Sequence, residues 1–205
     1  MIIAFAQQKG GAGKTTVLAH LAHAWADRGR SVGLADLDPQ RSLALWAANQ
    51  RDHDYTVIES AGWRAASDIR ELAQKCDVTL IDCPGNASSL LEAALRAADL
   101  VLMPCQPSML DAWATDPILK MAAKEKTPAR VLMNRMPPRG GIAEQVQAHL
   151  REHGAELLGA SLGNRVAFAS GLGSGTTALG MARTSRATQE VATLADEIEA
   201  LLGRQ

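Results

Sequence analysis

The stretch that decides the fold is QQKGGAGKTT, from Gln7 to Thr16, which joins an apolar segment to a helical pattern through a glycine-rich turn. Glycines let backbone N–H groups point toward phosphate oxygens, a lysine neutralises terminal phosphates, and a Ser or Thr hydroxyl can bind Mg²⁺. Gly13, Lys14 and Thr15 supply this combination. The stretch therefore predicts a phosphate-binding loop, although Gln8 stands where the strict motif has its first glycine.

Short apolar runs alternate with longer amphipathic stretches along the chain. The apolar runs predict strands at 2–7, 31–36, 55–60, 78–82, 100–105, 130–134 and 156–162. The amphipathic stretches predict helices at 15–28, 41–50, 64–75, 88–97, 115–124, 142–153 and 187–202. Continuous apolar strands separated by helices indicate a mostly parallel sheet buried on both faces. We therefore expect a doubly wound α/β fold in which helices flank the sheet.

Length and composition fit one domain. The 205 residues, 47% of them hydrophobic, suffice for one well-buried domain and are few for two, so we expect a single domain over residues 1–205. A formal net charge of −1 gives no overall attraction to nucleic acid or anionic membranes, so such binding needs a local basic patch. Three cysteines without paired spacing, no signal-like segment and no long apolar run indicate a cytoplasmic protein.

The predicted sheet also indicates where a ligand would bind. Ligands of doubly wound sheets lie beyond the carboxyl ends of the strands, so we expect the loops after Gln7, Asp36, Asp82, Pro104 and Asn134 to converge on one site. The segment 169–177 is rich in Gly and Ser, and we expect it to be a mobile loop.

The order KGGxGKTT, from Lys9 to Thr16, resembles the deviant Walker A motif of the ParA/MinD family of partition and positioning ATPases. The resemblance implies a P-loop NTPase fold that binds ATP or ADP with Mg²⁺. It implies that Lys14 binds phosphates in its own subunit, whereas Lys9 reaches the nucleotide of the other subunit in a homodimer. A second cation from a partner would neutralise the triphosphate and couple dimerisation to ATP. The loop residues implied to contact the nucleotide are Gly10, Gly11, Ala12, Gly13, Lys14, Thr15 and Thr16.

Two segments that end in carboxylates match the same family. SVGLADLDPQ ends in DLDPQ, which resembles the family's switch I, and the resemblance implies that Asp36 lies near Mg²⁺ while Asp38 orients the attacking water. Taken alone, the Asp-Pro pair would indicate a turn. VTLIDCPG resembles a Walker B strand, which implies that Asp82 and Thr15 hold the Mg²⁺ shell.

Two later segments extend the resemblance. LVLMPCQPSMLDAWA, at 100–114, looks like the family's segment after its fifth strand, and VLMNR, at 131–135, looks like its adenine-edge strand. The second match implies that Asn134 contacts the base. The C-terminal third matches more loosely, and the short length resembles the small ParA subgroup, which has no separate DNA-binding extension.

The resemblance implies an ATPase that converts ATP and water to ADP and phosphate, dimerises with ATP and answers to a stimulating partner, ParB-like or equivalent. Such proteins segregate or position plasmids, chromosome regions or protein clusters, often over the nucleoid. Non-specific DNA binding is implied, with Arg165, Arg183 and Arg186 as candidates, although these residues equally fit a solvated loop and a helix N-terminus. The C-terminus is short and acidic, so we expect no membrane recruitment.

Two other classes with this fold remain as alternatives. A metal-cluster-handling ATPase needs cysteines that bridge a cluster across a dimer, and Cys76, Cys83 and Cys105 do not form such a set. A small-molecule kinase or ligase is disfavoured by DLDPQ and by the paired lysines. ATP hydrolysis without a second substrate would distinguish a positioning ATPase from such an enzyme.

Histidines occur in two helical patterns, His20 with His23 and His149 with His153. We expect both pairs to lie on ordinary helix faces rather than to bind metal, because the sequence shows no Cys or carboxylate partner for them.

Overall fold

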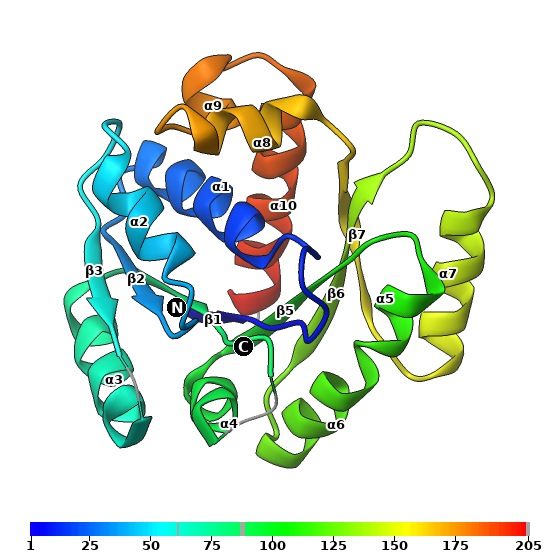
Figure 1. Cartoon of the computed structure of the whole chain (residues 1–205), viewed down its shortest axis with the longest axis horizontal. Coiled ribbons are helices and arrows are strands. Elements are labelled where there is room, and N and C mark those ends of the chain that lie inside the picture. The colour runs from blue at the N-terminus through cyan, green and yellow to red at the C-terminus, as the bar shows by residue number, and fades with distance from the viewer. Residues whose placement is uncertain (61, 87–88, 204–205) are drawn as a thin grey trace.

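In the computed structural model, which describes residues 1–60, 62–86 and 89–203, the described residues form a seven-stranded sheet whose paired strands are all parallel (Figure 1). The strands are β1 (Ile2–Phe5), β2 (Val32–Asp36), β3 (Thr56–Glu59), β4 (Val78–Asp82), β5 (Leu100–Cys105), β6 (Ala129–Met136) and β7 (Leu157–Gly163). Their order is β3-β2-β4-β1-β5-β6-β7. The chain winds to opposite sides of β1, and doubly wound sheets bind ligands at such a reversal.

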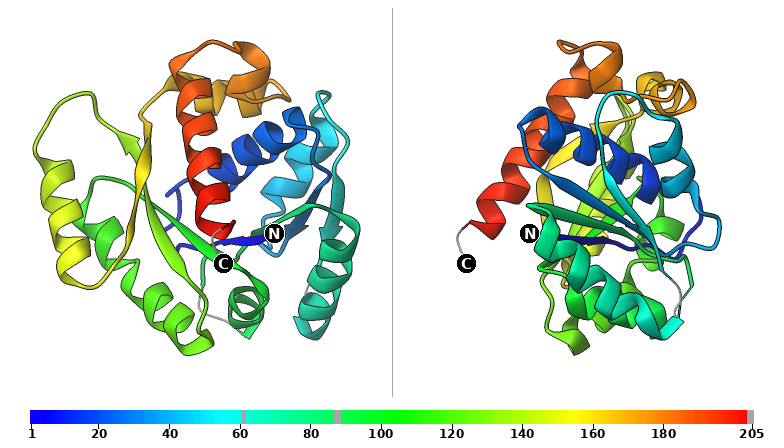
Figure 2. Two further views of the ribbon diagram at one scale, coloured as in Figure 1. Left: turned by 180° about the vertical axis from the view of Figure 1, so that it is seen from behind. Right: turned by 90° about the vertical axis from the view of Figure 1, so that its left-hand side faces the viewer.

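Helices cover both faces of the sheet, with α10 beside α1 on one face (Figure 2). The helices of that face are α1 (Lys14–Asp27), α2 (Ser42–Asn49), α8 (Val166–Gly173), α9 (Ala178–Met181) and α10 (Arg186–Leu202). Those of the other face are α3 (Ala65–Lys75), α4 (Ser89–Ala97), α5 (Met109–Trp113), α6 (Asp116–Glu125) and α7 (Ile142–Glu152). The sheet therefore separates two hydrophobic cores.

Successive strand residues belong to different cores. On β1, Ile3 lies in the core beneath α1 and α10, whereas Ala4 lies in the opposite core. Leu80 and Ile81 of β4 divide in the same way. All four side chains are fully buried. Because both faces exclude water, these strands carry continuous apolar sequence instead of alternating apolar and polar residues.

The predicted strands and helices are confirmed, with bounds within two residues of the predicted ones where the structure describes them. The predicted helix start at Ser88 lies outside the described residues. The sequence patterns did not predict α5, α8, α9 or the short 3₁₀ turn Gly62–Arg64. Each has at most eight residues, which is too short to show a clear helical period.

The expectation of a loop at 169–177 is wrong for residues 169–173, whereas residues 174–177 form the turn between α8 and α9. Residues as far as Gly173 belong to α8, and buried Thr177 caps α9 by accepting a hydrogen bond from the Leu179 N–H at 3.3 Å. Gly171 is also buried, and a Cβ atom there would lie 2.7 Å from the Thr177 carbonyl carbon. Gly171 therefore allows close packing between α8 and the segment that follows it, and the local glycine content does not make a loop.

Gly171→Ala should lower the free energy of unfolding by roughly 1–3 kcal/mol, because an added methyl group would push α8 away from the Thr177 backbone. Urea denaturation monitored by circular dichroism measures this change.

Gly173→Ala is the matched control in the same helix, because a Cβ atom there meets no atom within 4 Å. This substitution should leave stability unchanged or raise it by up to about 1 kcal/mol. Equal stability of the two variants would contradict the packing role of Gly171.

Candidate nucleotide-binding site

The connection between β1 and α1 is a tight loop that only glycine can form at two positions. Gly11 and Gly13 have φ values of 80° and 100°, in the left-handed region that strains other residues. A Cβ atom on Gly13 would also collide with the side-chain amide of Asn134. The loop then enters α1 at Lys14, so its backbone lies at the positive end of the helix dipole, where anions bind.

The buried side chain of Gln7 organises the start of this loop. Its Oε1 accepts hydrogen bonds from the N–H groups of Gln8 at 2.8 Å and Lys9 at 3.4 Å. Its Nε2 donates to the Pro104 carbonyl of β5 at 3.3 Å. Gln7 was not among the predicted site residues, and its position directly after an apolar strand was the available signal.

Two further amides hold the middle of the loop. Gln106 Nε2 donates to the Gly11 carbonyl, and Asn134 Nδ2 donates to the Ala12 carbonyl, both at 2.8 Å. These side chains come from the ends of β5 and β6, so the predicted convergence of strand ends is confirmed for this part of the sheet. Gln106 was missed, because a glutamine in a loop has no distinctive sequence pattern.

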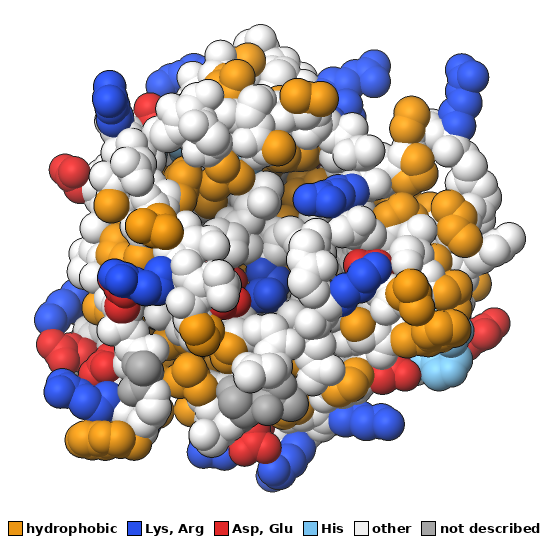
Figure 3. All heavy atoms as spheres, in the orientation of Figure 1, with side chains coloured by type: hydrophobic (Ala, Val, Ile, Leu, Met, Phe, Trp, Pro, Cys, Tyr) orange, Lys and Arg blue, Asp and Glu red, His pale blue; other side chains and the backbone are white. Residues whose placement is uncertain are grey.

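The two lysines of the loop have different partners. Lys14 Nζ lies 3.4 Å from the Gln7 carbonyl oxygen, so the side chain folds back over the loop. Lys9 Nζ makes an ion pair with Asp111 of α5, whose side chain is fully buried, while the Lys9 side chain remains 38% exposed. On the face of the molecule that Figure 3 shows, basic side chains lie next to acidic ones near the centre. The two lysines are five residues apart in the sequence, but their side chains contact different partners.

A buried carboxylate lies beside the loop. Thr15 Oγ1 donates a 2.5 Å hydrogen bond to Asp82 Oδ2 at the end of β4. Asp82 Oδ1 is buried and has no hydrogen-bond partner among the described residues. Burial raises the pKa of Asp82 to about 7, against the opposing effects of the Thr15 hydrogen bond and of Lys14. Thr15 and the unpaired oxygen fit a bound Mg²⁺, a hard cation that takes oxygen ligands.

Asp36 pairs with Asp82 in the register of β2 and β4, so the two carboxylates end adjacent strands. The Asp36 oxygens accept hydrogen bonds from the N–H groups of Asp38 at 3.1 Å and Ala44 at 2.9 Å. Burial raises the pKa of Asp36 despite these hydrogen bonds. Asp36 therefore fixes the turn between β2 and α2 and brings a second carboxylate to the position next to Asp82.

Asp38 lies in that turn and is half-buried. Its Oδ1 accepts a hydrogen bond from the Gln40 N–H at 2.9 Å, an arrangement typical of a turn-forming aspartate. The side chain therefore combines a structural contact through Oδ1 with a second oxygen that can accept a further hydrogen bond.

A cavity of about 310 Å³ opens beside the loop. Its lining includes Gly13 and Thr16 on one side, Asn134 at the end of β6, and Arg165 at the start of α8. Its volume is at the lower end of the range for small-molecule pockets. The cavity therefore lies between the glycine-rich loop and Asn134, the residue predicted to contact the base.

The three arginines proposed for DNA binding do not lie together in one environment. Arg165 lines the cavity, and its Nε donates to Glu190 at 2.9 Å. Arg183 and Arg186 are exposed before and at the start of α10, and they make no ion pair among the residues that the structure describes.

Among all the described residues, no helix is both long and apolar enough to cross a membrane.

A glycine-rich loop between a parallel strand and a helix, Lys-Thr at the start of that helix, and a buried aspartate on the neighbouring strand define a P-loop nucleotide-binding protein. Residues 3–179 match the family model described as the CobQ/CobB/MinD/ParA nucleotide binding domain. The chain belongs to this family.

Individual relatives agree with this assignment. The chain is 27% identical to the maintenance of carboxysome distribution protein A of Halothiobacillus neapolitanus, over 98% of the chain and 94% of the relative. It is 31% identical to the protein ParA of Rhizobium radiobacter, over 82% and 81%. The fold matches the septum site-determining protein MinD of Pyrococcus horikoshii, solved with Mg-ADP, with a TM-score of 0.81, 21% identity and coverage of 99% and 97%.

The raised pKa of Asp82 makes stability depend on pH. Between its unfolded value of 3.8 and its folded value of about 7, the folded chain keeps a proton that the unfolded chain releases. The free energy of unfolding contributed by Asp82 is therefore highest below this window and falls as pH rises through it. Asp82→Asn removes this loss. The free energy of unfolding of the variant relative to the parent should therefore be higher at pH 8 than at pH 5, by roughly 1 kcal/mol or more. Urea denaturation without Mg²⁺ or nucleotide at both pH values measures the gain.

Asp54→Asn, at an exposed carboxylate, is the control and should keep the pH dependence of the parent. If Asp82→Asn also kept it, the buried carboxylate would not be the source of the effect.

Proposed function

We propose that this chain is an ATPase that binds ATP with Mg²⁺, dimerises in the ATP state, and uses slow, partner-stimulated hydrolysis to position a cellular cargo. The observation that carries the proposal is the separation of the two loop lysines. Lys14 folds over its own loop, whereas Lys9 turns away to Asp111 and stays partly exposed. A partly exposed lysine that points away from its own loop can be reached by a second subunit, in exchange for its contact with Asp111.

Within one subunit, the loop supplies the phosphate contacts. The backbone N–H groups of residues 10–16 surround the phosphates, and Lys14 neutralises the terminal ones. Thr15 and Asp82, with Asp36 beside them, would hold Mg²⁺ and its waters, and the ion would offset charge on the phosphate oxygens. Asn134, which already contacts the loop and lines the cavity, would contact the base.

Hydrolysis requires a water held in line with the terminal phosphate. We assign this task to Asp38, whose backbone is fixed by the Asp36 carboxylate and whose own side chain lies at the turn before α2. Lys9 of the second subunit would add positive charge to the same phosphates as negative charge develops on them. Turnover would therefore depend on dimerisation.

The cargo and the partner are proposed from the relatives. Similarity to a carboxysome-distribution protein and to a ParA protein supports a role in positioning or partition. We propose a ParB-like or equivalent stimulating partner and non-specific DNA binding over the nucleoid. With a net charge of −1, DNA binding must use a local surface, and exposed Arg183 and Arg186 offer one.

Single substitutions of the two lysines should have different effects. Lys14→Ala should weaken ATP binding at least about a hundredfold, because charged hydrogen bonds to phosphate are lost. Lys9→Ala should keep ATP affinity within about threefold but remain a monomer and lose most hydrolysis, because its phosphate contact lies in the other subunit. Calorimetric titration measures affinity, and sedimentation with a non-hydrolysable ATP analogue measures dimerisation.

Lys9→Ala also leaves the buried Asp111 carboxylate without its cation, which can destabilise the fold. The same test is therefore made in Lys9→Ala combined with Asp111→Asn, and Asp111→Asn alone is the matched control that keeps Lys9. The control should dimerise and the double variant should not. A dimer of parental strength in the double variant would exclude the role of Lys9 in the second subunit.

DNA retention should appear with ATP, disappear with ADP, and weaken steeply with salt, because phosphate contacts release counterions. Arg183→Glu with Arg186→Glu should reduce retention at least about tenfold without changing ATP-dependent dimerisation. Gel-shift titration and sedimentation measure the two properties.

The control pair is Arg70→Glu with Arg151→Glu, which makes the same change in net charge on exposed residues of α3 and α7. These helices cover the opposite face of the sheet from α10. Equal loss of DNA in both pairs would show a general charge effect and would remove Arg183 and Arg186 from the DNA surface.

A further inference from the structure

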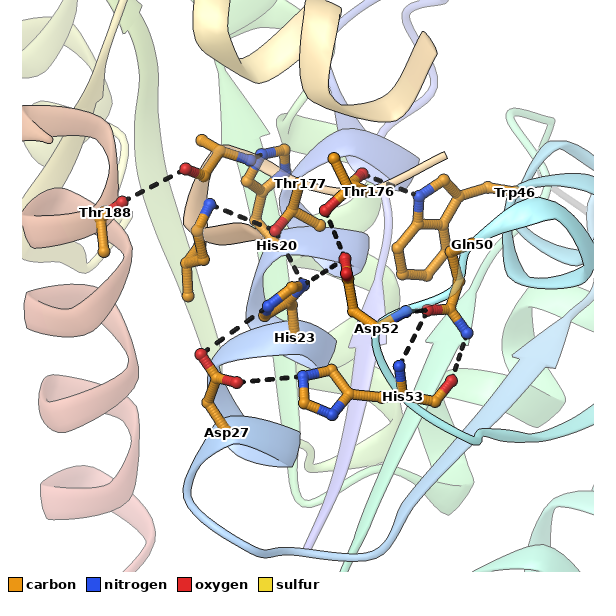
Figure 4. A network of polar contacts seen from close by, with 12 residues as sticks. His20, His23, Asp27, Trp46, Gln50, Asp52, His53, Thr176, Thr177 and Thr188 are labelled. Atoms are coloured by element: carbon orange, nitrogen blue, oxygen red, sulfur yellow. Dashed lines mark hydrogen bonds and ion pairs between the residues drawn. The ribbon is translucent and has the colours of Figure 1, made fainter. Parts of the chain in front are cut away.

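A group of histidines and aspartates lies at the far end of α1 from the glycine-rich loop (Figure 4). His23 and Asp27 are one turn apart on α1, and His53 enters from the segment between α2 and β3. His23 Nε2 lies 3.7 Å from Asp27 Oδ2, and His53 Nε2 lies 3.0 Å from Asp27 Oδ1. The two imidazole rings are nearly perpendicular, with centroids 4.6 Å apart.

These distances fit the coordination shell of a small divalent ion. Zinc binds imidazole nitrogen and carboxylate oxygen at about 2.0–2.2 Å, so neighbouring ligand atoms around a tetrahedral ion lie about 3.3 Å apart. The separations of 3.0 and 3.7 Å, each to a different oxygen of the Asp27 carboxylate, lie on either side of that value. One potential donor atom from each of the three residues lies within 4.8 Å of the others. The donors therefore converge before any ion is bound.

One potential ligand atom of this group makes no hydrogen bond. His53 Nε2 is buried and makes no hydrogen bond among the described residues, and its 3.0 Å contact with Asp27 Oδ1 is an ion-pair contact. His20, one turn earlier on α1, is different: its Nδ1 contacts the Thr16 carbonyl at 2.7 Å, and its Nε2 accepts from the Ala178 N–H at 3.0 Å. His149 Nε2 on α7 is likewise buried and makes no hydrogen bond, but among the described residues only the group around His53 brings a carboxylate and a second imidazole close enough to share an ion.

The surroundings of His23 and His53 match those of metal ligands. His23 Nδ1 lies 2.9 Å from Thr177 Oγ1 and 3.7 Å from Asp52 Oδ2, so the ring is held from the side opposite Asp27. Such contacts orient a ligating imidazole and leave its other nitrogen for the ion. Burial lowers the pKa of His23, which favours the neutral ring that metals bind.

The segment that carries His53 is also fixed. Gln50 Oε1 accepts hydrogen bonds from the N–H groups of Asp52 at 2.9 Å and His53 at 3.1 Å, and Gln50 Nε2 donates to the His53 carbonyl. One side chain therefore closes the turn in the position that brings His53 to α1. A site whose ligands are already held loses little entropy when the ion binds.

We propose that His23, Asp27 and His53 form a binding site for a divalent transition-metal ion, Zn²⁺ foremost, with a fourth position for water. Two imidazoles and one carboxylate select such an ion over Mg²⁺, which prefers oxygen ligands. The ion would join the end of α1 to the α2–β3 segment and, through Thr177, to α9. The expectation that His23 is not a ligand is replaced by this proposal, because Asp27 lies one turn away on the same helix and His53 approaches from a distant segment.

The test is zinc binding to the full chain, freed of nucleotide and metal by a chelator. Calorimetric titration with Zn²⁺ should show one ion per chain, and Co²⁺ should give the absorption of a tetrahedral nitrogen and oxygen site. Asp27→Asn and His53→Gln should each bind Zn²⁺ at least about tenfold more weakly. Zn²⁺ should raise the melting temperature of the parent and not that of these variants, because only a bound ion stabilises the folded state.

Two variants serve as matched controls. Asp54→Asn removes an exposed carboxylate from the same segment, and His153→Gln disrupts the other histidine pair, whose rings lie 4.0 Å apart on α7. Both should bind Zn²⁺ as the parent does. Unchanged affinity in Asp27→Asn and His53→Gln, absence of zinc binding in the parent, or a thiolate band in the cobalt spectrum would each overturn the proposal. Melting of every variant without zinc shows that it is folded.

Discussion

The parallel pairing of β1 with both β4 and β5 is the constraint on which the site depends. It places the end of β1 next to the end of β4, where Phe5 and Asp82 are register partners, and next to β5, which continues into Gln106. The glycine-rich loop therefore emerges between the Asp82 carboxylate, which contacts Thr15, and the Gln106 amide, which holds the loop backbone. An antiparallel strand at this place would put one of these groups at the opposite edge of the sheet.

Electrostatics then determines what the assembled site binds. The loop is held by the neutral amides of Gln7, Gln106 and Asn134, so these supports add no positive charge. Asp36 and Asp82 are buried on adjacent strands, and burial raises the pKa of both. Their ionised forms need a nearby cation, and a Mg²⁺ complex of a polyphosphate supplies that cation together with the anion that the loop binds. Metal and nucleotide are therefore expected to bind as one unit.

The fold could be predicted from the sequence because its signals are local. Apolar runs, helical periods and the order of glycines and lysines each lie within about twenty residues. Partners from distant segments could not be predicted: Asp111 holds Lys9 across 102 positions, and Gln106 reaches Gly11 across 95. The segment 169–177 was misjudged because glycine suits a flexible loop and a close backbone contact equally well, and only the position of Thr177 distinguishes the two.

Helix α1 connects the proposed nucleotide site with the proposed zinc site. Its first residues are Lys14 and Thr15, next to the glycine-rich loop, whereas His23 and Asp27 lie near its end. Between them, His20 fixes the middle of the helix to the α9 backbone, and burial lowers its pKa to about 4, so this contact stays neutral and intact across the physiological range. Helix α1 is therefore held at its start by the glycine-rich loop, in its middle by His20 and near its end by His23. We expect a change in the α2–β3 segment or α9 that moves the far end of α1 to act also on the glycine-rich loop.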